Sequence, residues 1–169
     1  MSPKFITLFL SGLLLTSALV AHAAPAALPD QNDQLLSLAD YPNQTVLAIV
    51  VSGRKLRHIK KWEEGIRKVY PQLTSVRVAD ITDEPRPSQE QVAEKLRKRA
   101  PADVRIMIDM DNLWATEYEL DTREPCLLLF DDNGQVIAQF RGRANKDRLN
   151  EVMVVLAEIF PPAAADEIS

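Results

Sequence analysis

The sequence predicts an α/β fold in which a central mixed sheet of about five strands is flanked by helices. From residue 45 onward, apolar runs typical of strands alternate with segments whose apolar residues recur every three or four positions, the period of a helix. The last two apolar runs are separated only by a turn sequence, which indicates a hairpin added to three parallel strands. The predicted order is therefore β-α-β-α-β-α-β-β-α.

The predicted strands are apolar runs bounded by turn residues. Residues 45–51, with the sequence TVLAIVV, form a continuous apolar run, as expected of a strand buried on both faces. The Asn133-Gly134 dipeptide lies between the last two strands and is typical of a tight hairpin turn. The other predicted strands are residues 75–81, 103–109, 125–130 and 135–142.

Caps and apolar faces define the predicted helices. The first helix follows residue 52, ends at Pro71 and carries one apolar face, made of Leu56, Ile59, Trp62, Ile66 and Val69. Gly65 weakens this helix and indicates close packing against a neighbour. Ser88 with Gln91 forms a capping box for a second helix that runs to about residue 99. Residues 112–120 form a short helix, and Asn145 caps the last one, whose inner face carries Leu149, Val152, Met153, Leu156 and Ile159.

The beginning of the chain predicts export. In residues 1–23, Lys4 precedes an apolar stretch that ends in Ala21-His22-Ala23, the pattern of a cleaved signal peptide. A retained membrane anchor is the alternative, although an apolar run of about 16 residues is shorter than the roughly 20 that span a bilayer. We expect a flexible lead-in over residues 24–44, one domain over 45–160 and a disordered tail over 161–169. The protein is then periplasmic or secreted, with no stable membrane insertion after signal cleavage.

The charge and the cysteine content argue against several classes of partner and site. The formal net charge of −4 argues against nucleic acid and anionic membranes as partners. Cys126 is the only cysteine, so the chain cannot form an internal disulfide. The carboxylates of Asp109 and Asp111 lack the glycine and distal glutamate of a calcium loop, and we expect no metal and no cofactor.

Residues 104–152, with the sequence VRIMIDMDNLWATEYELDTREPCLLLFDDNGQVIAQFRGRANKDRLNEV, carry a family resemblance. A strand ending in Asp, a short helix leading to a proline, a hairpin and a closing helix resemble the thioredoxin-like superfamily, especially its exported TlpA-like and AhpC/TSA-like branch. The resemblance extends over residues 45–158 and implies a three-layer sandwich. It also implies that Pro125 follows a cis peptide bond and stands beside a redox centre.

The sequence departs from that family at the catalytic position. The family places Cys-x-x-Cys just after the first strand, where a helix N-terminus lowers the pKa of a thiol. Arg54 and Arg57 stand at or near those two positions in this chain. Neither residue can do thiol chemistry, so we do not expect dithiol oxidoreductase activity.

The degenerate active-site edge is predicted to contain Arg54 and Arg57, because ligands bind outside the carboxyl ends of parallel strands. The resemblance implies that Glu124 and Pro125 belong to the same edge. The arginines have three interpretations: part of a solvated helical stripe, an internal ion pair with Glu124, or a site for an external anion or partner. Cys126 is interpreted either as a buried apolar filler or as a reactive thiol.

Two functional hypotheses follow. The favoured one is a binding or assembly module without dithiol redox activity, which uses this edge to bind a periplasmic protein partner and is not an enzyme. The alternative is a single-thiol redox enzyme or sensor, of peroxidase or reductase type, in which Cys126 reacts with a thiol supplied by another molecule. A wholly buried Cys126 would contradict the alternative.

Overall fold

The computed structural model describes residues 25–82 and 85–160. The predicted leader and the predicted tail lie outside the described residues. The elements are β1 (Leu28–Pro29), β2 (Leu35–Leu36), the 3-10 helix η1 (Leu38–Asp40), β3 (Val46–Ser52), the 3-10 helix η2 (Gly53–His58), α1 (Ile59–Arg67), β4 (Thr74–Asp80), α2 (Gln89–Arg99), β5 (Met107–Asp109), α3 (Leu113–Glu117), β6 (Cys126–Phe130), β7 (Val136–Arg141) and α4 (Lys146–Ile159).

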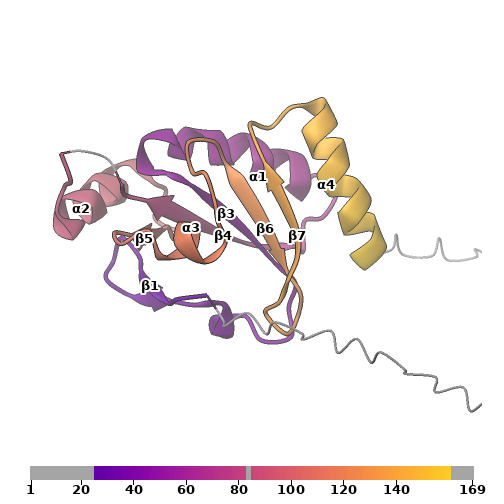
Figure 1. Ribbon diagram of the computed structural model, residues 1–169, viewed down its shortest axis with the longest axis horizontal. Helices are drawn as coiled ribbons and strands as arrows, with labels where there is room; N and C mark the ends of the chain where they lie inside the picture. Colours follow the sequence, from indigo (N-terminus) through magenta and orange to yellow (C-terminus); the bar gives the residue numbers. More distant parts are fainter. Residues whose placement is uncertain (1–24, 83–84, 161–169) are drawn as a thin grey trace, which may run out of the picture.

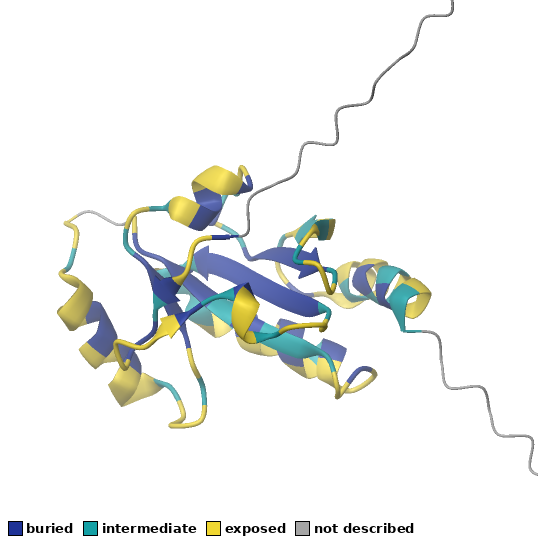
Figure 2. Cartoon of the chain, turned by 90° about the horizontal axis from the view of Figure 1, so that it is seen from below, coloured by how far each residue is buried: buried dark blue, intermediate teal, exposed yellow. Residues whose placement is uncertain are grey.

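The central sheet has five strands in the order β5-β4-β3-β6-β7, which confirms the predicted mixed sheet (Figure 1). Strands β3, β4 and β5 are parallel, whereas β6 and β7 form the antiparallel hairpin. Gly134 occupies the hairpin turn with φ of +75°, a conformation that glycine adopts without strain. Because β3 lies in the middle of the sheet and is buried along residues 46–51, its apolar run needs no polar face (Figure 2).

Helices cover one face of the sheet, where α1 and α4 pack on β3 and β6. Trp62 of α1 and Leu156 of α4 are fully buried there among the apolar side chains of these strands. A Cβ on Gly65 would lie 2.6 Å from Cδ2 of Leu149, so this glycine permits the close approach of α1 and α4. The predicted role of Gly65 in close packing is confirmed, as are the caps formed by Ser88 and Asn145.

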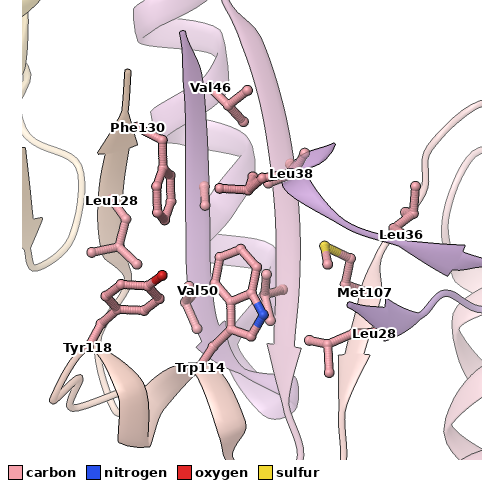
Figure 3. Close-up of a cluster of buried hydrophobic side chains, with 13 residues drawn as sticks. Leu28, Leu36, Leu38, Val46, Val50, Met107, Trp114, Tyr118, Leu128 and Phe130 are labelled. Carbon is pink, nitrogen blue, oxygen red and sulfur yellow. The ribbon is translucent and has the colours of Figure 1, made fainter. Parts of the chain in front are cut away.

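The opposite face of the sheet is covered by α3 and by the N-terminal hairpin (Figure 1). Trp114, Tyr118 and Phe130 pack edge to face, with ring centroids 5.7 to 6.1 Å apart (Figure 3). The buried side chains of Leu28 and Leu36 complete this cluster from the N-terminal side. The fold is therefore a three-layer sandwich.

The prediction of a flexible lead-in over residues 24–44 is wrong for its described part. Residues 25–44 contain β1, β2 and η1, and they are fixed by polar as well as apolar contacts. Nε of Arg105 donates to the buried carboxylate of Asp30 at 2.6 Å, and Oε1 of Gln31 accepts from the amide of Ile106 at 2.8 Å. The composition of this segment is typical of a flexible one. No local pattern indicates the contacts that fix it, because Arg105 and Ile106 are about 75 residues away in the sequence.

Two helical details also differ from the prediction. Residues 53–58 form a 3-10 helix, and the α-helix begins only at Ile59. Val69, expected on the inner face, is 58% exposed because α1 ends at Arg67 before the next inward position. Arg54 and Arg57 therefore do not occupy the first turn of an α-helix.

Candidate functional site

The candidate site lies at the carboxyl ends of the parallel strands. Ser52 ends β3, Asp80 ends β4 and Asp109 ends β5, and these three residues are paired in register across the sheet. The chain leaves β3 directly into η2, which contains Arg54 and Arg57. The amide of Ser52 donates to the carbonyl of Thr122 at 2.9 Å, which joins the end of β3 to the loop before β6.

Two buried aspartates lie beneath the surface at this end of the sheet. Asp80 and Asp109 are 1% and 0% exposed and are direct neighbours on adjacent strands. Asp109 accepts hydrogen bonds from the amides of Leu113 and Trp114, at 3.0 and 2.9 Å, and so holds the beginning of α3. The sequence analysis considered Asp109 as a metal ligand and did not predict these hydrogen bonds to the beginning of α3. Within residues 25–82 and 85–160, no three His, Cys, Asp or Glu side chains are grouped as metal ligands would be.

Asp80 connects the sheet to the loop that carries Glu124 and Pro125. Its Oδ2 accepts a hydrogen bond from the hydroxyl of Thr122, which is itself buried. The same oxygen lies 3.4 Å from the hydroxyl of Thr82. The position of the loop is thus fixed by a side-chain bond to β4 as well as by the backbone bond to Ser52.

Asp121 is shared by two arginines at the surface of this loop. Its carboxylate accepts from Nε of Arg123 at 2.7 Å and also from Nη2 of Arg141 at the end of β7. The hydrogen bond from Arg123, with the positive charge of Arg141, holds the pKa of Asp121 well below its usual range. Sequence reasoning missed both arginines because neither stands near the strand-to-helix segment that it examined.

Glu124 pairs with an arginine that the sequence analysis did not consider. Its Oε2 lies 3.3 Å from Nε of Arg143, just beyond the end of β7. Arg57 forms no ion pair with Glu124 within the described part of the chain, so the structure does not support the internal pair as the interpretation of Arg57. The hairpin returns Arg143 to the loop before β6, as the hydrogen bond from the amide of Gly142 to the carbonyl of Pro125 shows.

Lys55 and His58 complete the polar surroundings. The Nζ of Lys55 donates to the carbonyl of Arg123, which fixes η2 against the loop. Partial burial, together with the positive charges of Arg143 and Arg57, lowers the pKa of His58 below its usual value of 6.5. Nδ1 of His58 is buried with no hydrogen-bond partner among the described residues. His58 is therefore mainly neutral at pH 7 in a cationic environment.

The structure brings all four residues of the predicted edge to one end of the sheet, but it buries one of them. Arg54 and Arg57 are exposed and Glu124 is partly exposed, whereas Pro125 is buried. The cis peptide bond before Pro125 stays a prediction. We use the term basic edge for six residues that η2, the loop and the end of β7 contribute: Arg54, Lys55, Arg57, Arg123, Arg141 and Arg143.

Cys126 is the first residue of β6 and is buried, with 1% of its surface exposed. Its Sγ lies 3.4 and 3.5 Å from the backbone carbonyls of Asp121 and Glu124, to which the thiol can donate. Burial raises the pKa of this thiol to about 11, so the thiolate needed for nucleophilic attack is scarce at neutral pH. The structure favours the interpretation of Cys126 as a buried filler and contradicts a reactive surface thiol.

Solved structures supply the comparison with known proteins. The exposed lipoprotein thioredoxin Etrx1 of Streptococcus pneumoniae matches 78% of this chain and 99% of its own, with a TM-score of 0.62 and 15% identity. A thiol-disulfide oxidoreductase of Bacteroides fragilis matches 79% and 98%, with a TM-score of 0.56 and 18% identity. The chain has a thioredoxin-like fold.

A secreted disulfide oxidoreductase of Mycobacterium tuberculosis has the same fold, with a TM-score of 0.54 and 9% identity over 77% of this chain and 95% of its own. No protein-family model and no curated protein sequence matches the chain. With its single cysteine, this thioredoxin-like chain has no Cys-x-x-Cys centre. No helix among the described residues is long and apolar enough to cross a bilayer.

Proposed function

We propose that the chain is an exported binding or assembly module, which uses the basic edge of its thioredoxin-like fold to bind a protein partner in the periplasm. The observation that carries this proposal is the replacement of thiols by exposed cations. At the end of β3, Arg54 and Arg57 are exposed on a 3-10 helix, and the only thiol, Cys126, is buried. The accessible groups can bind charge but cannot exchange disulfides.

The construction of the edge supports binding rather than catalysis. Three segments converge there and are joined by backbone bonds, from Ser52 to Thr122 and from Gly142 to Pro125. A surface fixed in this way loses little conformational entropy when a partner binds. Export is supported by the predicted leader and by the match to proteins described as an exposed lipoprotein and a secreted oxidoreductase.

The single-thiol alternative has less support. A nucleophilic thiol must be accessible and must ionise, whereas Cys126 is 1% exposed and its pKa is about 11. Attack by such a thiol on an external disulfide would require the beginning of β6 to open.

The proposed function is tested by capturing partners from a periplasmic extract on the immobilised protein. Arg54→Ala with Arg57→Ala removes two charges from the edge, and Lys95→Ala with Arg99→Ala removes two exposed charges from α2 as the matched control. We expect the edge variant to lose at least one partner that the parent and the control both retain. Identical partner sets for all three proteins would show that the edge is only a solvated surface.

A further inference from the structure

We infer that the basic edge binds a carboxylate-rich segment of a partner protein. This inference rests on the proposed function and adds the chemistry of the partner to it. Its basis is a local surplus of positive charge on a protein whose formal net charge is −4. Within the described part of the chain, the carboxylates that form ion pairs with the edge cations other than Arg54 are Asp121 and Glu124, and they do not balance these cations.

The surplus can be followed residue by residue. Asp121 alone pairs with both Arg123 and Arg141, so one positive charge of this trio is not neutralised. Glu124 pairs with Arg143, and this pair is neutral. The side-chain fractions of Arg123, Arg141 and Arg143 exposed to solvent are 84%, 52% and 65%, so incoming carboxylates can reach their guanidinium groups.

Two further cations add to this surplus from η2. Lys55 donates to a neutral carbonyl, that of Arg123, so this hydrogen bond does not offset its positive charge. Arg57 is exposed and forms no ion pair within the described part of the chain. Even without Arg54, the edge carries five cations against the two carboxylates that pair with them among residues 25–82 and 85–160, a surplus of three positive charges.

Guanidinium groups arranged around one carboxylate favour further carboxylates as ligands. Arginine presents a planar set of donors that matches the two oxygens of Asp or Glu, and such charge-assisted bonds are stronger than neutral ones. Asp121 already shows this recognition inside the molecule, because it accepts from two Arg123 nitrogens at 2.7 and 2.6 Å. An acidic segment that crosses the edge would make the same kind of charge-assisted contact at Arg57 and at Arg123, whose side chain is 84% exposed.

A protein segment fits the surface better than a lipid bilayer or a nucleic acid. The chain as a whole is acidic, so an extended anionic surface would repel most of it while attracting only the edge. Membrane-surface binding also uses exposed apolar side chains. None of the large exposed apolar residues in the described part of the chain belongs to the basic edge; they are Leu35, Val69, Leu113, Ile137 and Val154.

The test measures the binding of a fluorescein-labelled decaglutamate peptide to the full chain by fluorescence anisotropy. A decaglutamine peptide serves as the uncharged probe. The edge variant is Arg57→Ala with Arg123→Ala, and the matched control is again Lys95→Ala with Arg99→Ala. A second edge variant, Arg57→Gln with Arg123→Gln, keeps most of each side-chain stem and guards against loss of folding.

We expect decaglutamate, but not decaglutamine, to bind the parent and the control with similar affinity. Both edge variants should bind about tenfold more weakly, because two charge-assisted contacts are lost. Equal affinity for the edge variants and the parent would overturn the inference, as would equal binding of the two peptides. Free glutamate and inorganic phosphate are compared as competitors of the bound decaglutamate. Displacement by phosphate at concentrations far below those needed for glutamate would also overturn the inference, as would binding of the protein to phosphatidylglycerol vesicles without binding of the peptide.

The result can be separated from the fate of the proposed function. If partner capture depends on Arg54 and Arg57 but decaglutamate does not bind, the edge binds a partner of other chemistry and only this inference is wrong. If decaglutamate binds but capture does not depend on the edge, the affinity for carboxylates is confirmed and the proposed function is wrong.

Discussion

The buried and exposed groups at the carboxyl end of the sheet have opposite properties. Beneath the surface, Cys126 and Asp109 lie in a closed interior where the thiol is neutral and the carboxylate accepts backbone hydrogen bonds. Above them, Arg57 and Arg123 are exposed and carry permanent charge. The thiol, which could react with a disulfide, is therefore inaccessible, and the accessible guanidinium groups cannot react with one.

This difference shows how a thioredoxin-like fold can keep its architecture without its chemistry. The interior determines the position of the loop through the bonds of Asp80 and Ser52 to Thr122. The edge contributes charged side chains, most of which are exposed to solvent. Substitutions in the two regions should therefore have separable consequences, in reactivity and stability for the interior and in binding for the edge.

The largest expected effect concerns the reactivity of Cys126. With a pKa of about 11 in the folded protein instead of 9.0, the thiolate fraction at pH 7.5 is about 100-fold lower than in the unfolded chain. Alkylation by iodoacetamide should therefore be at least about 100-fold slower in buffer than in concentrated urea. Similar rates under the two conditions would show that the thiol is accessible in the folded protein and would contradict the contrast between a buried thiol and an exposed basic edge.

The second effect concerns the stability of the interior. Asp109→Ala removes the buried acceptor of the Leu113 and Trp114 amides and should lower the free energy of unfolding by about 2 to 4 kcal/mol. Asp111→Ala, at an exposed carboxylate two residues away, should change it by less than about 0.5 kcal/mol. Urea unfolding monitored by tryptophan fluorescence measures both values. Equal losses would mean that Asp109 does not support this end of the sheet.

A smaller effect is expected from His58, which lies between the two regions. Its pKa is lower in the folded chain than the ordinary 6.5, so the unfolded chain takes up the proton first as the pH falls. The stability contribution of neutral His58 is therefore complete above pH 6.5 and is lost as the pH falls through the folded pKa. Partial burial is the main cause of the lowered pKa; the charges of Arg143, Arg57 and Lys55 lower it further, whereas that of Glu124 raises it.

NMR titration of the His58 ring, assigned with His58→Gln, measures that pKa directly. The variant should also lose less stability than the parent between pH 7 and pH 5. A folded pKa above 6.5 would contradict the cationic surroundings described for this residue.

The smallest effect is expected for the stability of the edge itself. Arg57→Ala and Arg143→Ala should each change the free energy of unfolding by less than about 0.5 kcal/mol, because exposed ion pairs contribute little. Urea unfolding again provides the measurement. A loss as large as that of Asp109→Ala would mean that the basic residues maintain the fold rather than remain available to a ligand.

The sequence predicted the sheet and its covering because both follow local periodicity. The apolar run of residues 46–51, the Asn133-Gly134 turn and the caps at Ser88 and Asn145 each carry their signal within a few residues. The missing Cys-x-x-Cys was also visible, since it needs only the comparison of one strand-to-helix segment with a known family.

The contacts between distant segments could not be predicted in the same way. The pairing of Glu124 with Arg143 and of Asp121 with Arg141 depends on how the hairpin returns the end of β7 to the loop before β6. The order in residues 25–44 likewise depends on Arg105 and Ile106, which are distant in sequence. A single sequence shows that such groups exist but not which of them meet.

The central claim is that this protein binds partners through its exposed cations and not through its thiol. The most direct test compares the partners captured from a periplasmic extract by the parent, by Cys126→Ala and by Arg54→Ala with Arg57→Ala, each eluted with and without a reductant. We predict that Cys126→Ala retains the partners of the parent, that reductant releases none of them, and that the arginine variant loses them. Loss of the partners from Cys126→Ala, or their release from the parent by reductant alone, would contradict the claim.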